Sequence, residues 1–119
     1  MKKKQFGQKG EAFALAHLKK RGYTIITTNW QCPYGEIDII ARQENTLVFV
    51  EVRSRHSHST EAAFSSIDNR KRKKLQASAY AYLSEHESED ILWRIDVIAI
   101  AIPREGAPIV EHLENALDW

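Results

Sequence analysis

The chain has 119 residues, of which 43% are hydrophobic and 28% charged, and its net charge is +1. This composition is ordinary for one globular domain over residues 1–119, and it excludes a wholly disordered chain; no apolar stretch approaches the length of a membrane span. The near-neutral net charge neither supports nor excludes a polyanionic partner, so the placement of the charges matters more than their sum.

The cysteine content and the first residues favour a cytoplasmic protein. Cys32 is the single cysteine, so an intramolecular disulfide is impossible, and it lacks the neighbours of a zinc site. Residues 2–4 are all lysine, as at the start of a signal peptide, but no apolar run follows them. We therefore expect a cytoplasmic location without membrane contact.

The first third of the chain predicts a helix and then a strand. Residues 7–20 place Phe13, Leu15 and Leu18 among polar residues, and Arg21-Gly22 is typical of a helix end. The β-branched residues 23–28 predict a strand, and residues 29–35, which contain a proline and a glycine, predict a connection.

Two strands of a β-hairpin are predicted next, over residues 35–41 and 47–53, with the polar residues 42–46 between them. If Glu44 and Asn45 form the tip, Ile40 lies opposite Phe49. Residues 47–52 are apolar almost throughout, which is typical of a central strand covered on both faces. We therefore expect helices above and below this strand.

The same register brings two acids together. Asp38 would lie opposite Glu51, and Glu36 opposite Arg53, whereas a three-residue loop would put the two acids on opposite faces. Like charges directly opposite each other destabilise an antiparallel pair, and a bound Mg²⁺ or Mn²⁺ would offset their repulsion. The alternative is that Arg53 or Arg55 holds the carboxylates at the strand end.

The second half of the chain predicts a loop over residues 54–66 and a helix, capped by Ser66 or Asp68, that runs to about residue 86. Residues 87–90 break that helix, residues 93–100 form a strand, and a turn over residues 103–108 precedes the last segment. The order is α-β-β-β-α-β, an α/β fold with a central mixed sheet flanked by helices. Within the last strand, Asp96 is expected to have a structural role, paired with Arg94 or with a helix terminus.

A basic run over residues 70–74 opens the second helix, so positive charge gathers near the two acids. A solvated helix face is the alternative explanation of such a run. The candidate contacts to nucleic acid, with DNA preferred, are Arg55, Arg70, Lys71, Lys73, Lys74 and Gln76. Gln76 and Tyr80 share one helical face; we expect Tyr80 to be half-buried and structural, and the histidines at 56 and 58 to be solvated.

Metal-dependent cleavage of a phosphodiester requires ligands for the ion and a cation near the phosphate. Asp38 and Glu51 are the candidate ligands, and Glu11 would join them if the first helix packs across that end of the sheet. Arg53 lies two residues after Glu51, on the same face, where it can stabilise negative charge. It cannot act as a general base, because a guanidinium does not lose its proton at working pH.

The chain resembles the PD-(D/E)xK nuclease superfamily, whose pattern is a strand ending in an acid, a turn, and then acid, any residue and lysine; here Asp38 and Glu51-Val52-Arg53 match it. The chain also resembles the YraN-like bacterial family, which is similar to archaeal Holliday junction resolvases, at residues 10–12, 35–38, 49–52 and 94–97. The resemblance implies a restriction-endonuclease-like core and Glu11, Asp38 and Glu51 as metal-binding acids. It implies an endonuclease on structured or branched DNA, although Arg53 replaces the usual catalytic lysine. The pair Gln76 and Tyr80 is similar to the Gln-x-x-x-Tyr pair of some related nucleases.

Two other functions fit the same residues. In the first, Arg53 marks a degenerate site, and the chain is a nucleic-acid-binding module without catalysis. In the second, the chain is a protein-interaction domain, which exposure of Trp30, Trp93 and Trp119 would favour. A branched substrate would suit a homodimer, and nothing in the sequence demonstrates one.

Overall fold

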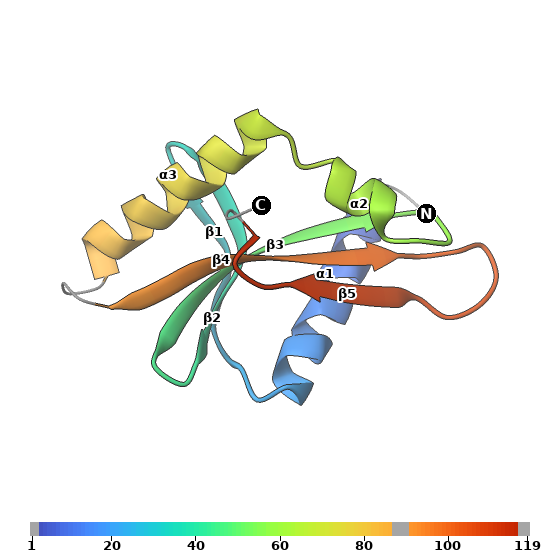
Figure 1. The fold of residues 1–119 in the computed structure, drawn as a ribbon, viewed down its shortest axis with the longest axis horizontal. Coiled ribbons are helices and arrows are strands. Elements are labelled where there is room, and N and C mark those ends of the chain that lie inside the picture. The colour runs from blue at the N-terminus through green and yellow to red at the C-terminus, as the bar shows by residue number, and fades with distance from the viewer. Residues whose placement is uncertain (1–2, 87–90, 117–119) are drawn as a thin grey trace.

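The fold is α/β, as predicted, with a five-stranded mixed sheet flanked by helices (Figure 1). The computed structural model describes residues 3–86 and 91–116. Its elements are α1 (Lys3–Lys20), β1 (Thr24–Cys32), β2 (Gly35–Gln43), β3 (Thr46–Arg55), α2 (Glu61–Ser65), α3 (Asn69–His86), β4 (Leu92–Ala101) and β5 (Ile109–Leu113). None of the helices within these described ranges is long and apolar enough to cross a membrane.

The sheet follows the chain order β1-β2-β3-β4-β5. The first three strands form an antiparallel meander, β4 lies parallel to β3, and β5 is antiparallel to β4. A parallel neighbour requires a crossover, and α2 and α3 supply it. The two helices of the crossover therefore lie against the strand that carries Glu51.

The core has one layer on each face of β3. On one face, Ala14 and Leu18 of α1 pack against Val48 and Val50. On the other face, Leu75, Ala79 and Tyr82 of α3 pack against Leu47 and Phe49. Figure 1 shows α1 and α3 on opposite sides of the sheet. The prediction of a central strand covered on both faces is confirmed.

The predicted hairpin register is confirmed. Ile40 pairs with Phe49 and Gln43 with Thr46, which leaves Glu44 and Asn45 as a two-residue tip. Glu44 has φ = 52°, in the left-handed region that tight hairpin turns use. The ladder ends at Ile39 and Val50, so the predicted pairing does not extend to Glu36 and Arg53. The two strands separate at the level of Asp38.

Several element boundaries were predicted wrongly. The expected connection over residues 29–35 is mostly strand, because β1 runs to Cys32 and pairs with β2 up to Gly35. The expected loop over residues 54–66 contains the end of β3 and the short helix α2. A fifth strand, β5, forms after the predicted turn, with Val110 and His112 half-buried between exposed neighbours. The predicted break at residues 87–90 lies outside the described residues.

Gly10 allows α1 to lie directly on β3. A Cβ atom at this position would clash with the side chain of Ser54, which is itself buried. We expect Gly10→Ala to lower the free energy of unfolding by about 1–3 kcal/mol, since α1 must move away from the sheet. Urea unfolding measures this difference.

The matched control is Gly7→Ala, three residues earlier in the same helix. A Cβ atom there meets no other atom within 4 Å. Because alanine has a higher helix propensity than glycine, Gly7→Ala should raise the free energy of unfolding by about 0.5–1 kcal/mol. Equal effects of the two substitutions would contradict a tight contact between α1 and β3.

Candidate active site

Asp38 lies in β2, one residue before its ladder with β3 begins at Ile39, and its carboxyl group faces β3. The backbone N–H of Val52 donates a hydrogen bond to Asp38 Oδ2 at 2.8 Å. The carboxyl group of Glu51 lies close enough that its charge and a side-chain hydrogen bond raise the pKa of Asp38. The two acids that the register brings together in the sequence therefore meet in the structure.

Glu51 is buried, with 2% of its surface exposed, and is held by two cations. Its Oε2 lies 3.3 Å from an Arg53 guanidinium nitrogen and 3.1 Å from Lys71 Nζ. A buried carboxylate needs such partners, because its desolvation is otherwise unfavourable. The alternative of an arginine-held carboxylate is thus correct for Arg53, and Lys71 is a second cation that the sequence placed among the nucleic-acid contacts.

Lys71 reaches Glu51 from the first turn of α3. Asp68 caps this helix, as predicted, by accepting the backbone N–H of Lys71 at 2.8 Å. The cap fixes the backbone of the residue whose ammonium group contacts the buried acid. Within the basic run, spacing alone does not distinguish Lys71 from Lys73 or Lys74, which are exposed.

The pKa of Asp38 is raised from 3.8 to about 8. Burial is the largest cause, followed by the charge of Glu51 and a side-chain hydrogen bond with it. The Val52 N–H and the Lys71 ammonium act in the opposite direction. Asp38 therefore carries a proton at neutral pH. A proton on this carboxyl pair and a divalent cation bound to it would relieve the same repulsion, so the two would compete.

Glu11 approaches the pair from α1, as expected if that helix packs across this end of the sheet. Its Oε2 accepts a hydrogen bond from Asn29 Nδ2 at 3.3 Å. Burial raises the pKa of Glu11, and the neighbouring acids Asp38 and Glu36 raise it too. Asn29 has φ = 51°, a conformation that asparagine tolerates better than most residues.

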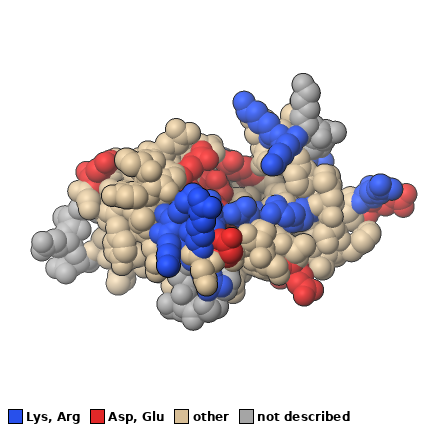
Figure 2. All heavy atoms as spheres, turned by 90° about the horizontal axis from the view of Figure 1, so that it is seen from above, with Lys and Arg blue, Asp and Glu red and all other residues tan. Residues whose placement is uncertain are grey.

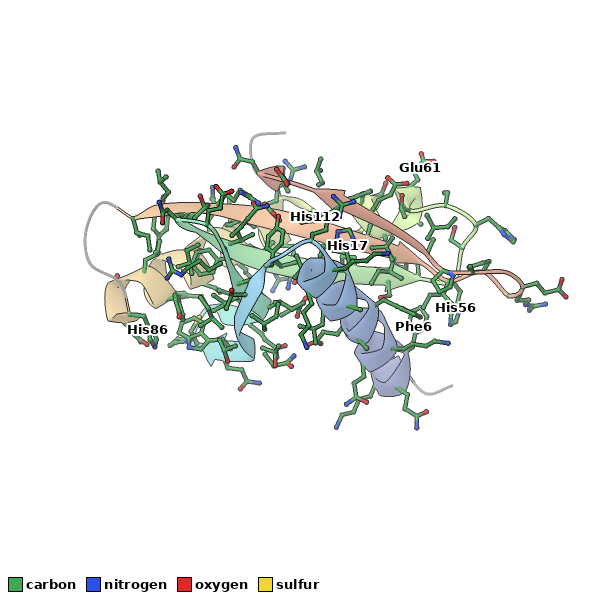
Figure 3. The ribbon with its side chains drawn as sticks, turned by 90° about the horizontal axis from the view of Figure 1, so that it is seen from below. Phe6, His17, His56, Glu61, His86 and His112 are labelled. Atoms are coloured by element: carbon green, nitrogen blue, oxygen red, sulfur yellow. The ribbon has the colours of Figure 1, made fainter. Side chains whose placement is uncertain are left out.

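A cavity of about 400 Å³ opens beside Glu11, Asp38 and Arg53. It is lined by Glu11, Asp38, Arg53 and Arg55 from the predicted set, together with Lys3, Phe6, Gly7, Val52, Ser54 and His56. Phe6 and His56 stack with their ring centroids 4.1 Å apart (Figure 3). His56 is exposed, as predicted, but it packs on α1 and does not stand free in a loop.

Three acids do not form one compact cluster in the structure. Over residues 3–86 and 91–116, no group of three or more His, Cys, Asp or Glu side chains is arranged to hold a metal ion. Asp38 and Glu51 contact each other, while Glu11 lies across the cavity. The arrangement offers a carboxylate pair and one additional acid.

The remaining basic candidates lie on the outer surface. Arg70, Lys73, Lys74 and Gln76 are exposed on α3, and Figure 2 shows lysine and arginine side chains gathered on this side of the molecule, next to acidic ones. Arg55 is nearer to the acids, where it lines the cavity and donates to the backbone carbonyl of Ser54 at 2.7 Å. The site thus has an inner group of cations and an outer one.

The exposure of the aromatic side chains differs from two expectations, one for Tyr80 and one for the tryptophans. Tyr80 is 59% exposed and not half-buried, because α3 turns Leu75, Ala79 and Tyr82 toward the sheet. Trp30 and Trp93 are partly buried against the same core cluster, so they do not supply the exposure that would favour a protein-interaction domain. Trp119 lies outside the described residues.

Comparison with known proteins places the chain among bacterial relatives of similar length. It is 40% identical over 116 residues to a UPF0102 protein of Roseiflexus castenholzii, with 96% of this chain and 94% of the relative covered. It is 45% identical over 111 residues to a UPF0102 protein of Chloroflexus aurantiacus, with 92% and 88% covered. The corresponding values for a UPF0102 protein of Geotalea daltonii are 37% over 115 residues, with 97% and 91% covered.

A family model described as "Uncharacterised protein family UPF0102" matches residues 10–100, which include α1 from Gly10 onward, the hairpin, α3 and most of β4. These matches confirm the resemblance to the YraN-like family. The chain belongs to the UPF0102 family.

Proposed function

We propose that this protein is a nuclease that depends on Mg²⁺ or Mn²⁺ and acts on structured or branched DNA. The observation that carries the proposal is the closely placed carboxyl pair of Asp38 and Glu51, whose interaction raises the pKa of Asp38, beside the ammonium of Lys71 and the guanidinium of Arg53. A purely structural ion pair would not require a second acid in contact with the first. Asp38 and Arg53 face an open cavity, with Glu51 and Lys71 behind them, and this arrangement suits a metal ion and a phosphate.

The donor set fits a hard divalent cation. Mg²⁺ is commonly held by one or two carboxylates, with water and substrate phosphate completing its shell, and the Asp38–Glu51 pair supplies those carboxylates. Glu11 is the additional acid across the cavity. When bound, such an ion lowers the pKa of a coordinated water and neutralises charge on the phosphate.

The cations of the chain have separate tasks in this proposal. Lys71 and Arg53 lie next to the acids and stabilise negative charge that develops on the cleaved phosphate. Arg70, Lys73 and Lys74 lie outside and hold the nucleic-acid backbone. Contacts of this outer kind carry little sequence information and weaken with salt, so recognition would depend on the shape of the substrate.

The first test is cleavage of labelled four-way junction, flap, single-stranded and duplex DNA in Mg²⁺, Mn²⁺ or chelator. We expect cleavage that requires the metal and favours a branched substrate over the duplex. Binding without cleavage in either metal would show a non-catalytic module instead, in which the cations permanently neutralise the acids. Absence of both binding and cleavage would contradict a nucleic-acid function.

Lys71→Met tests which cation serves the reaction. We expect kcat to fall about 10²-fold with little change in KM, since one preorganised charge donor is removed from the reacting phosphate. Lys73→Met removes an exposed lysine of the same helix turn and should weaken substrate binding with kcat retained. Equal kinetic effects of the two substitutions would contradict a role for Lys71 in the chemical step.

A further inference from the structure

A second cavity, of about 580 Å³, lies between the β1–β2 turn and the outer face of α3. It is lined by Pro33, Tyr34, Ala77, Tyr80, Ala81, Ser84 and Glu85, and we refer to it as the tyrosine groove. Its volume is within the range of small-molecule sites. None of the acids of the candidate active site lines it.

The two tyrosines of the groove are unusually accessible. Tyr34 is 56% exposed and Tyr80 is 59% exposed, and they come from elements that are distant in the sequence. The ring of Tyr80 is braced by Trp93, at a centroid distance of 5.4 Å and an interplanar angle of 72°. Ala77 and Ala81 leave space beside it. The groove therefore presents two aromatic rings to solvent, and Trp93 restricts the movement of one of them, Tyr80.

The charges next to the groove indicate what it binds. Lys73 and Lys74 are exposed on the same face of α3, one to two helical turns before Tyr80. Glu85 is the one acid among the lining residues, at the end away from the lysines. Aromatic surfaces that follow a row of cations suit a nucleotide, because a base stacks on the ring while the lysines contact phosphates. An acidic or purely apolar peptide would use only half of this surface.

We infer that the tyrosine groove binds an unpaired nucleotide, so that the substrate carries a single-stranded segment next to the cleaved phosphate. The inference rests on the nucleic-acid-binding part of the proposed function and narrows its substrate class. Lys71, at the acids, and Tyr80 are nine residues apart on α3, an axial rise of about 13 Å, and at about 100° per residue their side chains leave opposite sides of the helix. A single strand would therefore pass around α3, and the unpaired base lies more than about four stacked nucleotides from the cleavage point.

The test measures binding in chelator, where no cleavage takes place. Fluorescence anisotropy is recorded with a labelled 20-nucleotide oligothymidine, a blunt duplex, and a duplex with an oligothymidine overhang. We expect Tyr34→Ala and Tyr80→Ala each to weaken binding of the two oligothymidine probes by about 5- to 150-fold, the range for loss of one base-stacking contact. Blunt-duplex binding should change less than twofold. Tyr34→Phe and Tyr80→Phe keep the rings and should retain native affinity.

Ile109→Ala is the matched control, since it removes a 39% exposed apolar side chain from β5 and should leave all three affinities unchanged. Native affinity of both tyrosine-to-alanine variants for oligothymidine, or an equal loss on the blunt duplex, would overturn the inference. If Lys73→Met still weakened binding in that case, the proposed function would stand with a different substrate class. If the native protein bound none of the probes, the inference would fall, and binding of the labelled four-way junction would decide the proposed function separately.

Discussion

Asp38→Asn is expected to reduce metal-dependent cleavage by about 10³-fold or more, because loss of a ligand removes several kcal/mol of transition-state stabilisation. Asparagine keeps the size of the side chain and its acceptor oxygen for the Val52 N–H. It cannot supply the negative charge that would hold the ion of the proposed function. The measurement is single-turnover cleavage of the preferred substrate, with Glu105→Gln, an exposed acid of another loop, as the control that should remain active.

The stability of Asp38→Asn separates lost chemistry from lost folding. The pKa of Asp38 is about 8 in the folded protein and 3.8 when unperturbed. Between these values folding takes up a proton, so the free energy of unfolding of the native protein falls as pH rises from about 4 to about 8. The free energy of unfolding of the asparagine variant does not fall in this way. At pH 8 in chelator the variant should therefore be at least as stable as the native protein. Urea unfolding across this pH range tests the expectation, and a variant that is less stable than the native protein at pH 8 would contradict it.

Loss of cleavage without loss of stability would be typical of a functional site, where groups are kept for chemistry at the expense of stability. Burial of Asp38 beside the Glu51 charge lowers the free energy of unfolding as the pH approaches the raised pKa of Asp38. The neutral substitution relieves the repulsion between the two acids and removes the ligand charge at the same time. A structural ion pair behaves in the opposite way, since its removal destabilises the protein.

The acid pair was predictable from the sequence, and Lys71 was not. The pairing of Asp38 with Glu51 follows from a local rule, since a two-residue tip at Glu44 and Asn45 sets every partner in the hairpin. The contact of Lys71 with Glu51 depends on how the crossover returns α3 to the sheet. No local pattern encodes that approach. The basic run was visible as charge, while the division of its lysines between the acids and solvent was not.

The same distinction explains why β5 was not predicted. Ile109–Leu113 is short, and its pairing with β4 is supported by a side-chain contact between the two strands: His112 Nε2 donates a hydrogen bond to Asp96 Oδ2 at 2.8 Å. A structural role for Asp96 with Arg94 was predicted. The further partners of Asp96 come from β5 and from the chain after it, which no sequence pattern connects to β4.

Asp96 is the centre of a buried polar network. Its side chain is fully buried and contacts the Arg94 guanidinium at 2.9 Å, His112 Nε2 at 2.8 Å and the backbone N–H of Asn115 at 2.9 Å. His112 in turn contacts His17 of α1 at 3.2 Å between ring nitrogens, and Figure 3 shows the two rings side by side. The network therefore ties β4, β5 and the end of α1 together.

Burial raises the pKa of Asp96, but the hydrogen bonds from His112, Arg94 and the Asn115 N–H outweigh it and hold the pKa below 3.8. Asp96 thus contributes stability above its unfolded pKa, and this contribution is lost as pH falls through the lower folded value. The carboxylate is ionised in the folded protein at neutral pH. The guanidinium of Arg94 is therefore paired with a negative charge in the interior.

Asp96→Asn is expected to lower the free energy of unfolding by about 3–5 kcal/mol, because it leaves the Arg94 cation without its buried counter-charge. Urea unfolding at pH 7 measures the loss. Glu114→Gln is the control: Glu114 lies 3.7 Å from the same guanidinium, but its side chain is 60% exposed, so its removal should change stability by less than about 1 kcal/mol. Equal effects of the two substitutions would show that burial of Asp96 does not determine the strength of the pair, and that β5 is held to β4 by its backbone ladder alone.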